Sequence, residues 1–316
     1  MPVNANKPER WKSDTALSID FYNKWFMHFA PETFRVARQE ITVWVDQAIE
    51  HTANLVILSP TMLKQHPAVL KMLRMATAPP IARDRLSGLA NVSRTLIETL
   101  ENGKSPSAKA YGNLDDALAR ICDVIATLLD QDIFPWLAVS GQPTETDRLR
   151  AASIIADRLS GATADPIIRN AQERRQLATI QDFLEKRGYQ KISMPQSLVL
   201  HEMRPDTFTF RHNVVVGTSH QIRIPIDALI WPHNLHHSRL PIFVEAKSAG
   251  DFTNTNKRRK EEAQKMTQLK LHYGEDLTYI LFLNGYFDSG YLGYEAAEGI
   301  DWVWEHRIED LLELGV

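Results

Sequence analysis

Two short stretches, IRIPIDALI at residues 222–230 and PIFVEAK at residues 241–247, decide the fold expected for this chain. The side chains of a β-strand alternate between its two faces. In the first stretch the isoleucines therefore share one face and Asp227 lies on the other. In the second stretch Glu245 and Lys247 share one face, about 6.5–7 Å apart, and apolar residues share the opposite one. Neighbouring strands would bring the three polar side chains to one place.

The spacing of apolar residues along the sequence changes at about residue 160. Before it, apolar residues recur at three- and four-residue spacing, which indicates helices. After it, the pattern predicts a helix over 165–186, strands over 207–216, 221–230 and 240–247, a helix over 256–273, a strand over 278–284 and a helix over 301–314. The expected fold class is α/β. Residues 1–160 form a mainly helical domain for recognition or dimerisation, and residues 161–316 form an α/β core with a mixed sheet (helix, three strands, helix, strand).

Composition narrows the class of protein. The 316 residues are enough for two domains, and a net charge of -3 argues against a protein that coats nucleic acid by bulk charge. With Cys122 as the single cysteine, an intrachain disulfide is impossible and a cysteine-based metal site is implausible. The sequence has neither a membrane-spanning apolar run nor the hydrophobic core of a signal peptide, so a cytoplasmic protein is expected.

Phosphodiester hydrolysis needs the groups that the two strands supply. The carboxylates of Asp227 and Glu245 are hard oxygen ligands suited to Mg²⁺, with Mn²⁺ as a substitute. The bound cation would neutralise charge and lower the pKa of the attacking water, which Lys247 could orient or deprotonate. We therefore predict Asp227, Glu245 and Lys247 as catalytic residues, the two carboxylates being metal ligands. The alternative is an ordinary strand surface, with Asp227 exposed and Glu245 and Lys247 in a weak ion pair.

A third carboxylate is a candidate for the same metal. Glu173 lies one turn before Leu177 on the apolar stripe of the helix expected over 165–186. A carboxylate on a stripe that faces the core needs a partner. The partner is either the metal or a nearby arginine such as Arg174.

The segment that follows Lys247 has the composition of a phosphate-binding surface. Between residues 247 and 270 there are seven Lys or Arg and three acidic residues, and small or hydroxyl residues precede the basic run. The predicted DNA-binding residues are Ser248, Thr253, Asn254, Asn256, Lys257, Arg258, Arg259 and Lys260. The alternative is a solvated helix face on which Glu261 and Glu262 pair with bases one turn earlier.

The histidines of the connection between the two catalytic strands, His233, His236 and His237, suggest a metal site at first sight. No cysteine or acidic residue accompanies them in that loop, so a zinc site is disfavoured. A loop that contacts DNA is the preferred interpretation.

The run VEAKSAGDFTNTNKRRKEEAQK at residues 244–265, with ADPIIRNAQERR upstream and LFLNGYFDSGYLGYEAAEGIDWVWEHRIEDL downstream, resembles the XamI-type restriction endonucleases of the PD-(D/E)xK superfamily. The family's two carboxylates and lysine map onto Asp227, Glu245 and Lys247. The resemblance implies a homodimeric type II enzyme that cuts both strands of a short palindromic DNA site, leaves 5′-phosphates, and works beside a cognate DNA methyltransferase. It also suggests GTCGAC as the site. Two other functions stay open: a structure-specific repair or recombination nuclease of the same fold, and a non-catalytic DNA-binding protein.

Overall fold

The chain forms two compact units, each with its own core. The computed structural model describes residues 2–107, 111–139, 141–193, 200, 204–217, 221–233, 240–253 and 255–316, with the side chains of 256–258 left out. One unit, here called the sheet unit, combines Met1–Ala30 with Ile168–Val316. The other, the helical unit, is Pro31–Ile167.

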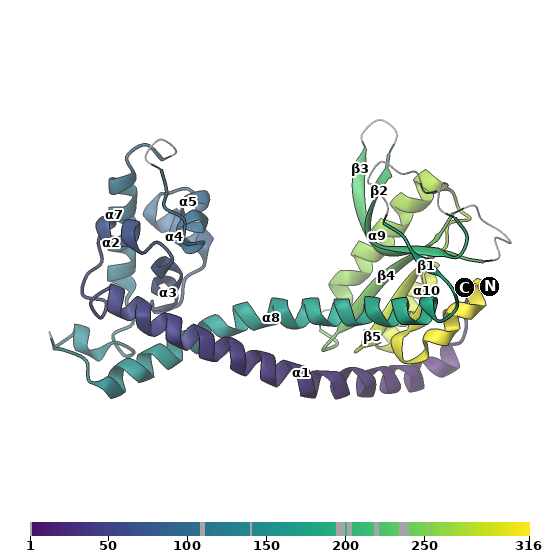
Figure 1. Ribbon diagram of the computed structural model, residues 1–316, viewed down its shortest axis with the longest axis horizontal. Coiled ribbons are helices and arrows are strands. Elements are labelled where there is room, and N and C mark those ends of the chain that lie inside the picture. The colour runs from purple at the N-terminus through teal and green to yellow at the C-terminus, as the bar shows by residue number, and fades with distance from the viewer. Residues whose placement is uncertain are drawn as a thin grey trace. The chain divides into compact units, whose positions relative to one another are not determined.

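The helical unit is built from short helices packed on parts of two long ones. Its elements are parts of α1 (Pro8–His51) and α8 (Glu145–Glu185), with α2 (Pro60–Gln65), α3 (Val69–Met75), α4 (Arg83–Ala90), α5 (Arg94–Glu101), α7 (Leu114–Leu128) and the 3-10 turn η1 (Pro135–Leu137) (Figure 1). The side chains of Ile49, Leu70, Leu118 and Ile155 are fully buried in its core. As expected, this part of the chain is mainly helical.

The two long helices pass from one unit into the other, and each contains a proline near the crossing. Pro31 lies inside α1 and Pro166 inside α8. The prediction that a separate helix begins at Asp165-Pro166 is wrong. Proline is common in the first turn of a helix, where its missing N–H costs no hydrogen bond. A proline inside a helix has the same neighbours in the sequence, so the sequence does not distinguish the two positions.

The first 30 residues belong with the sheet unit, whereas the expected division assigned them to the helical half. The carboxylate of Asp301 accepts hydrogen bonds from the backbone N–H of Asn4 and Ala5, at 2.9 Å each. The ring of Trp11 packs edge-on against Trp302, with 5.6 Å between centroids. These contacts join residues from the two ends of the chain, so no local sequence pattern predicts them. The expected boundary at residue 160 lies close to the crossing at residue 167.

A mixed sheet forms the centre of the sheet unit. The described strands lie in chain order: β1 (Gln190–Lys191), β2 (Thr207–Val216), β3 (Ile222–Trp231), β4 (Ile242–Ala249), β5 (Tyr279–Gly285) and β6 (Asp301–Trp304). Neighbours are antiparallel from β2 to β4 and parallel for β1–β2, β4–β5 and β5–β6. The expected α/β class with a mixed sheet is confirmed. Strand β1 was not expected, and β6 occupies the start of a segment expected to be entirely helical.

Helices cover both faces of this sheet. On one face, Leu177 and Ile180 of α8 pack with Val244 and Phe282 of the strands. The opposite face is covered by α9 (Thr255–Tyr273) and α10 (Ser289–Ala297), through residues such as Leu269. The chain ends in the 3-10 segment η3 (Glu305–Leu314). Figure 1 shows α8 and α9 beside the central strands of this unit.

Strict alternation along β3 is broken at Asp227. Ile224 and Ile226 pack in the same cluster as Leu229, whereas Ala228 and Ile230 pack on the opposite face. The expectation that all isoleucines of this strand share one face is therefore wrong. The neighbouring strand has an unusual backbone at the same level, because Arg211, between the partners of Ala228 and Ile226, has φ +53°. A positive φ turns a strand residue out of the regular pleat.

No helix in the described parts of the chain is both long enough and apolar enough to cross a membrane.

Candidate active site

Asp227 and Glu245 lie opposite each other on the two central antiparallel strands. The ladder pairs Ala228 of β3 with Val244 of β4, so the next position in the register brings the two carboxylates together. Asp227 is held in place by the backbone N–H of Ala246, which donates to its Oδ2 at 2.9 Å. The two predicted metal ligands are thus neighbours across one strand pair.

Lys247 completes the cluster on the face of β4 that α9 covers. Its Nζ lies 3.1 Å from Oε1 of Glu245 and 3.2 Å from Oε1 of Glu262, which α9 contributes. The second oxygen of Glu245, Oε2, accepts a hydrogen bond from Lys265 Nζ at 2.5 Å. Glu245 is 7% exposed. The alternative of an exposed, weak ion pair on a strand surface is therefore wrong for Glu245.

Four residues of this cluster were not predicted from the sequence: Glu262 and Lys265 of α9, and Tyr291 and Glu295 of α10. The Tyr291 hydroxyl lies 3.2 Å from Oε2 of Glu262 and donates to it. A signal for α9 was present, because Glu262 and Lys265 share the three- and four-residue spacing of the buried Met266 and Leu269. The alternative interpretation of this segment, a solvated helix face on which Glu262 pairs with Arg258, is wrong for Glu262, which is buried.

Burial of neighbouring carboxylates controls the electrostatics of the site. Burial, followed by the nearby charge of Glu245, raises the pKa of Asp227 to about 6. The N–H of Ala246 and the ammonium groups of Lys247 and Lys265 act in the opposite direction. Burial also raises the pKa of Glu295 to about 8, with the charge of Glu262 as the next cause.

The ammonium form of Lys247 is stabilised where it lies. Burial by itself would lower its pKa, but the carboxylates of Glu245 and Glu262 outweigh burial and raise it. Proton removal from Lys247 is therefore hard while both carboxylates face it. A divalent cation on Glu245 would compete for one of them and ease that constraint.

The chemistry of the donor set fits a hard divalent cation. The carboxylates of Asp227 and Glu245 lie close together, and the like-charge repulsion between them is one cause of the raised pKa of Asp227. Both are oxygen ligands of the kind Mg²⁺ prefers. Within the described ranges, no group of three or more His, Cys, Asp or Glu side chains is arranged to hold a metal ion. Water and a DNA phosphate would have to supply the remaining ligands, as is usual for Mg²⁺.

Two comparisons with known proteins bear on this geometry. The model of the XamI restriction endonuclease family matches residues 53–304. This chain belongs to that family. It is also 54% identical, over 314 residues and 99% of both chains, to the type II restriction enzyme SalI of Streptomyces albus G. No solved structure matches the chain. The prediction of a restriction endonuclease, a site-specific deoxyribonuclease, is confirmed.

Glu173, the third predicted metal ligand, makes a different contact in this member of the family. Its Oε1 lies 2.9 Å from the Arg211 guanidinium of β2, and its side chain is 37% exposed. An ion pair was the alternative left open, but the partner is Arg211 and not Arg174. Arg211 stands next to Asp227 in the strand register. The ion pair thus lies beside β3 at the level of Asp227, and a metal role for Glu173 stays a prediction.

Of the predicted DNA-binding residues, two make contacts within the protein near the end of β4, four lie wholly or with their side chains outside the described residues, and two lie in α9. Ser248 donates from its Oγ to Oε1 of Gln176 on α8, at 2.9 Å, so it faces away from Lys247. The backbone N–H of Thr253 binds the Asp251 carboxylate at 2.8 Å in a tight turn. Asn254 lies outside the described residues, and so do the side chains of Asn256, Lys257 and Arg258.

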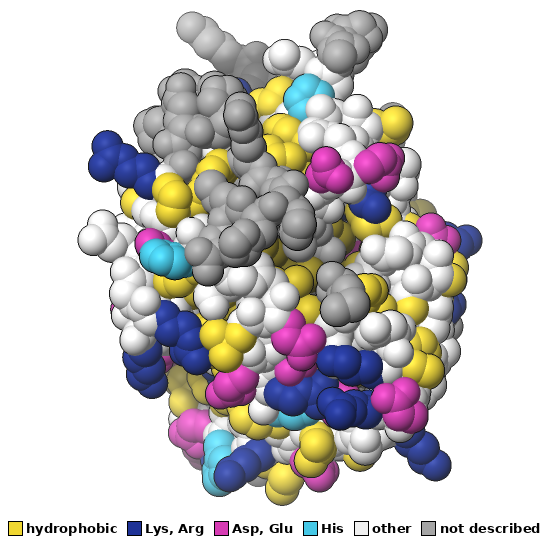
Figure 2. All heavy atoms as spheres, turned by 90° about the vertical axis from the view of Figure 1, so that its right-hand side faces the viewer, with side chains coloured by type: hydrophobic (Ala, Val, Ile, Leu, Met, Phe, Trp, Pro, Cys, Tyr) yellow, Lys and Arg dark blue, Asp and Glu magenta, His cyan; other side chains and the backbone are white. Residues whose placement is uncertain are grey.

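The last two predicted DNA-binding residues lie in the first turns of α9. Arg259 stacks its guanidinium over the Tyr294 ring, 4.9 Å from the centroid, and Lys260 is exposed. Of the loop histidines, His233 pairs with Asp206 at 2.8 Å, and the other two lie outside the described residues. Figure 2 shows basic and acidic side chains interspersed on the face it presents, in keeping with the small net charge.

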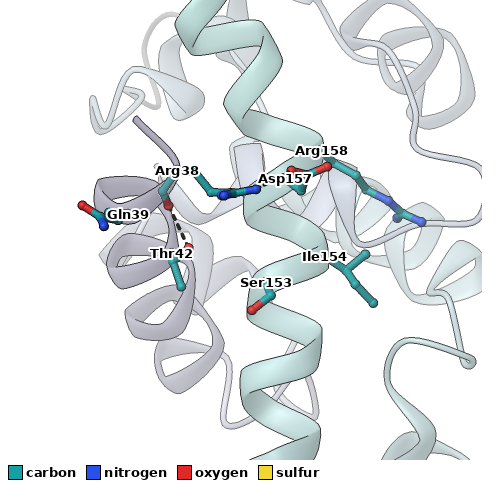
Figure 3. Close-up of a pocket in the computed structure, with 7 residues that line it drawn as sticks. All are labelled: Arg38, Gln39, Thr42, Ser153, Ile154, Asp157 and Arg158. Carbon is teal, nitrogen blue, oxygen red and sulfur yellow. Dashed lines mark hydrogen bonds and ion pairs between the residues drawn. The ribbon is translucent and has the colours of Figure 1, made fainter. Parts of the chain in front are cut away.

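The helical unit has a hollow of its own, of about 670 Å³, between α1 and α8. Its lining residues are Arg38, Gln39, Thr42, Ser153, Ile154, Asp157 and Arg158 (Figure 3). Arg38 and Asp157 form an ion pair across it at 3.6 Å, and Arg158 donates to the carbonyl of Met75 at 2.6 Å. The charged groups of Arg38, Asp157 and Arg158 therefore already have partners within the helical unit. The hollow contains none of the carboxylate–lysine chemistry of the sheet unit.

Proposed function

We propose that this enzyme hydrolyses both strands of a short palindromic double-stranded DNA site, with Mg²⁺ or Mn²⁺, and leaves 5′-phosphates. The observation that carries the proposal is the cluster of Asp227, Glu245 and Lys247 on adjacent strands. The full-length similarity to a type II restriction enzyme supports the reaction class. GTCGAC is the candidate site.

Each residue has a distinct role in this proposal. Asp227 and Glu245 would hold the cation, which when bound neutralises phosphate charge and makes its water more acidic. Lys247, whose ammonium form is stabilised by Glu245 and Glu262, orients the attacking water, and the proton of that water passes to solvent. The water oxygen forms the new bond to phosphorus while the bond from phosphorus to O3′ breaks. The O3′ leaves with a proton from solvent, and the phosphate stays on the 5′ end.

Symmetry supports a homodimer as the working form. A palindromic DNA site has a two-fold axis, and two identical chains related by such an axis present the same residues to both strands. One catalytic cluster per chain then suffices to cut each strand once. A host would need a methyltransferase that modifies the same site, acting as a functional partner without physical contact.

Digestion of a sequenced plasmid tests this function directly. With Mg²⁺ we expect discrete fragments whose sequenced ends all derive from one palindromic hexamer, with 5′-phosphate termini that ligate without further treatment. Methylation or a single base change within the hexamer should prevent cutting. A smear, or cuts at branched or mismatched DNA, would favour the structure-specific nuclease instead.

Lys260 should contribute to DNA binding through phosphate contact. It is an exposed base in the second turn of α9, the helix that follows the catalytic strand. A phosphate contact carries no base information. Lys260→Ala should therefore weaken binding of cognate and random DNA by the same factor and flatten the logarithmic salt dependence by about one unit. Titrations on both DNAs at several salt concentrations check this.

The control for that experiment is Arg259, whose guanidinium already stacks on Tyr294. Arg259→Ala should change the salt slope less than Lys260→Ala. If Lys260→Ala kept the affinity and salt slope of the unmodified enzyme, the Lys260 ammonium group would be solvated and would have no role in DNA binding. A loss of affinity confined to cognate DNA would mean that Lys260 contacts a nucleobase.

A further inference from the structure

The ammonium group of Lys247 is held by carboxylates from two different elements. Glu245 of the same strand and Glu262 of α9 approach it at 3.1 and 3.2 Å. A lysine side chain has many rotamers, and a group that acts on a water must be kept in one of them. The two contacts from two directions restrict where Nζ can lie.

The two carboxylates are not equivalent. Glu245 also binds Lys265 and is a proposed ligand of the cation, so its charge is shared among three partners. Glu262 is more deeply buried, at 2% exposed, and its Oε1 faces Lys247. If Glu245 coordinates the cation, Glu262 remains as the anionic partner of Lys247.

Glu262 is in turn fixed by α10. Its Oε2 accepts the Tyr291 hydroxyl at 3.2 Å, and Tyr291 is 1% exposed. Glu295 lies one helical turn beyond Tyr291, with its side chain fully buried. A buried carboxylate is tolerated only when partners compensate it, and for Glu262 these partners are Lys247 of β4 and Tyr291 of α10. Both oxygens of Glu262 are thereby engaged within the protein.

We propose that Glu262 is a positioning residue for the catalytic reaction: held by Tyr291, it keeps the Lys247 ammonium in place beside the attacking water. The proposal rests on the proposed catalytic role of Lys247. Glu262 itself would touch neither DNA nor the cation. Its removal should therefore slow the chemical step and leave binding of DNA and of the metal unchanged.

The test is Glu262→Gln, which keeps the shape and the acceptor for Tyr291 but removes the charge that attracts Lys247. Single-turnover cleavage should fall about 10- to 100-fold, the range expected when a reacting group is displaced by up to about 1 Å. The Mg²⁺ concentration that gives half-maximal rate, and cognate DNA binding in Ca²⁺, should stay within about twofold of the unmodified enzyme. Glu261→Gln is the matched control, because it makes the same charge change at the exposed neighbouring position.

Tyr291→Phe provides a second variant if Glu262→Gln does not fold, as judged by circular dichroism and thermal melting. It removes one hydroxyl and should give a smaller rate loss in the same direction, again at constant Mg²⁺ requirement. A full rate in Glu262→Gln, or in Tyr291→Phe when only that variant folds, would overturn the proposal. A Mg²⁺ requirement raised fivefold or more in Glu262→Gln would also overturn it, because Glu262 would then be a metal ligand.

Failure of the underlying function gives a different result. If Lys247→Ala cleaved at the normal rate, Lys247 would not be catalytic and there would be nothing for Glu262 to position. If Lys247→Ala is inactive and Glu262→Gln is fully active, only the positioning role fails. Loss of rate in both, with Glu261→Gln normal and the Mg²⁺ requirement unchanged, supports the role of Glu262.

Discussion

Asp227→Asn, Glu245→Gln and Lys247→Ala should each lower single-turnover cleavage by at least about 10³-fold, the scale on which enzymes lose rate when a directly acting group is removed. The first two changes remove a proposed oxygen ligand of the cation, and the third removes the group proposed to orient the attacking water. Radiolabelled or fluorescent cognate duplex with saturating enzyme and Mg²⁺ measures this rate without interference from product release.

Asp227→Asn should at the same time make the protein more stable. Its pKa is raised to about 6 by burial and by Glu245, so the folded state binds the proton more tightly than the unfolded state. The ionised carboxylate therefore destabilises the fold at pH 7–8, and this penalty disappears as the pH falls below the unfolded value near 4. Replacement by a neutral side chain should raise the free energy of unfolding at pH 7.5 by roughly 1–3 kcal/mol.

An inactive and more stable variant excludes misfolding as the cause of inactivity. Binding of cognate DNA in Ca²⁺ should persist in both carboxylate variants, because each removes a charge that repels phosphate. Asp276→Asn, at an exposed turn of the same unit, is the matched control and should change neither rate nor stability. Near-normal cleavage by any of the three variants would remove that residue from the catalytic set.

Removal of divalent cations should abolish cleavage completely. EDTA should stop the reaction, Mg²⁺ or Mn²⁺ should restore it, and Ca²⁺ should support binding without turnover. Ca²⁺ accepts the same oxygen ligands as Mg²⁺, but with looser geometry and weaker polarisation of bound water. Cleavage that survives extensive chelation would show that the two carboxylates serve another purpose.

The metal requirement should also depend on pH in a direction set by Asp227. Protons compete with the cation for this carboxylate, whose pKa in the metal-free site is about 6. Above pH 7 the Mg²⁺ concentration for half-maximal rate should be nearly constant. Below pH 6 it should rise by about tenfold per pH unit, because one proton must leave before the cation binds. A requirement that stays flat down to pH 5 would mean that Asp227 is not a ligand.

Strand periodicity was sufficient to predict the central features of the site. Glu245 and Lys247 are two residues apart on one strand, and the next strand along the chain carries Asp227. Adjacent strands in an antiparallel connection usually pair, so short-range rules predicted the neighbourhood of these groups. The same rules failed at Asp227 itself, where the alternation of β3 changes phase beside the left-handed backbone of Arg211.

Helix boundaries near proline were beyond these rules. Asp165 followed by Pro166 has the local pattern of a helix start, yet α8 continues through Pro166, as α1 continues through Pro31. The missing hydrogen bond of an interior proline is a cost that tertiary packing can offset, and packing is not written in the neighbouring residues. The assignment of residues 1–30 to the sheet unit has the same origin, since their partners near Asp301 lie almost 300 positions away.

The amino-acid sequence alone was enough for the class of fold, the three polar groups on two strands and the family, because each depends on residues close together in the chain. The surroundings of those groups depend on the packing of α9 and α10 against β4. That packing joins Glu262 and Tyr291 to Lys247, and Lys265 to Glu245. A charged residue on a helix looks solvated until the opposing surface is known, so only the tertiary structure could place these side chains inside the site.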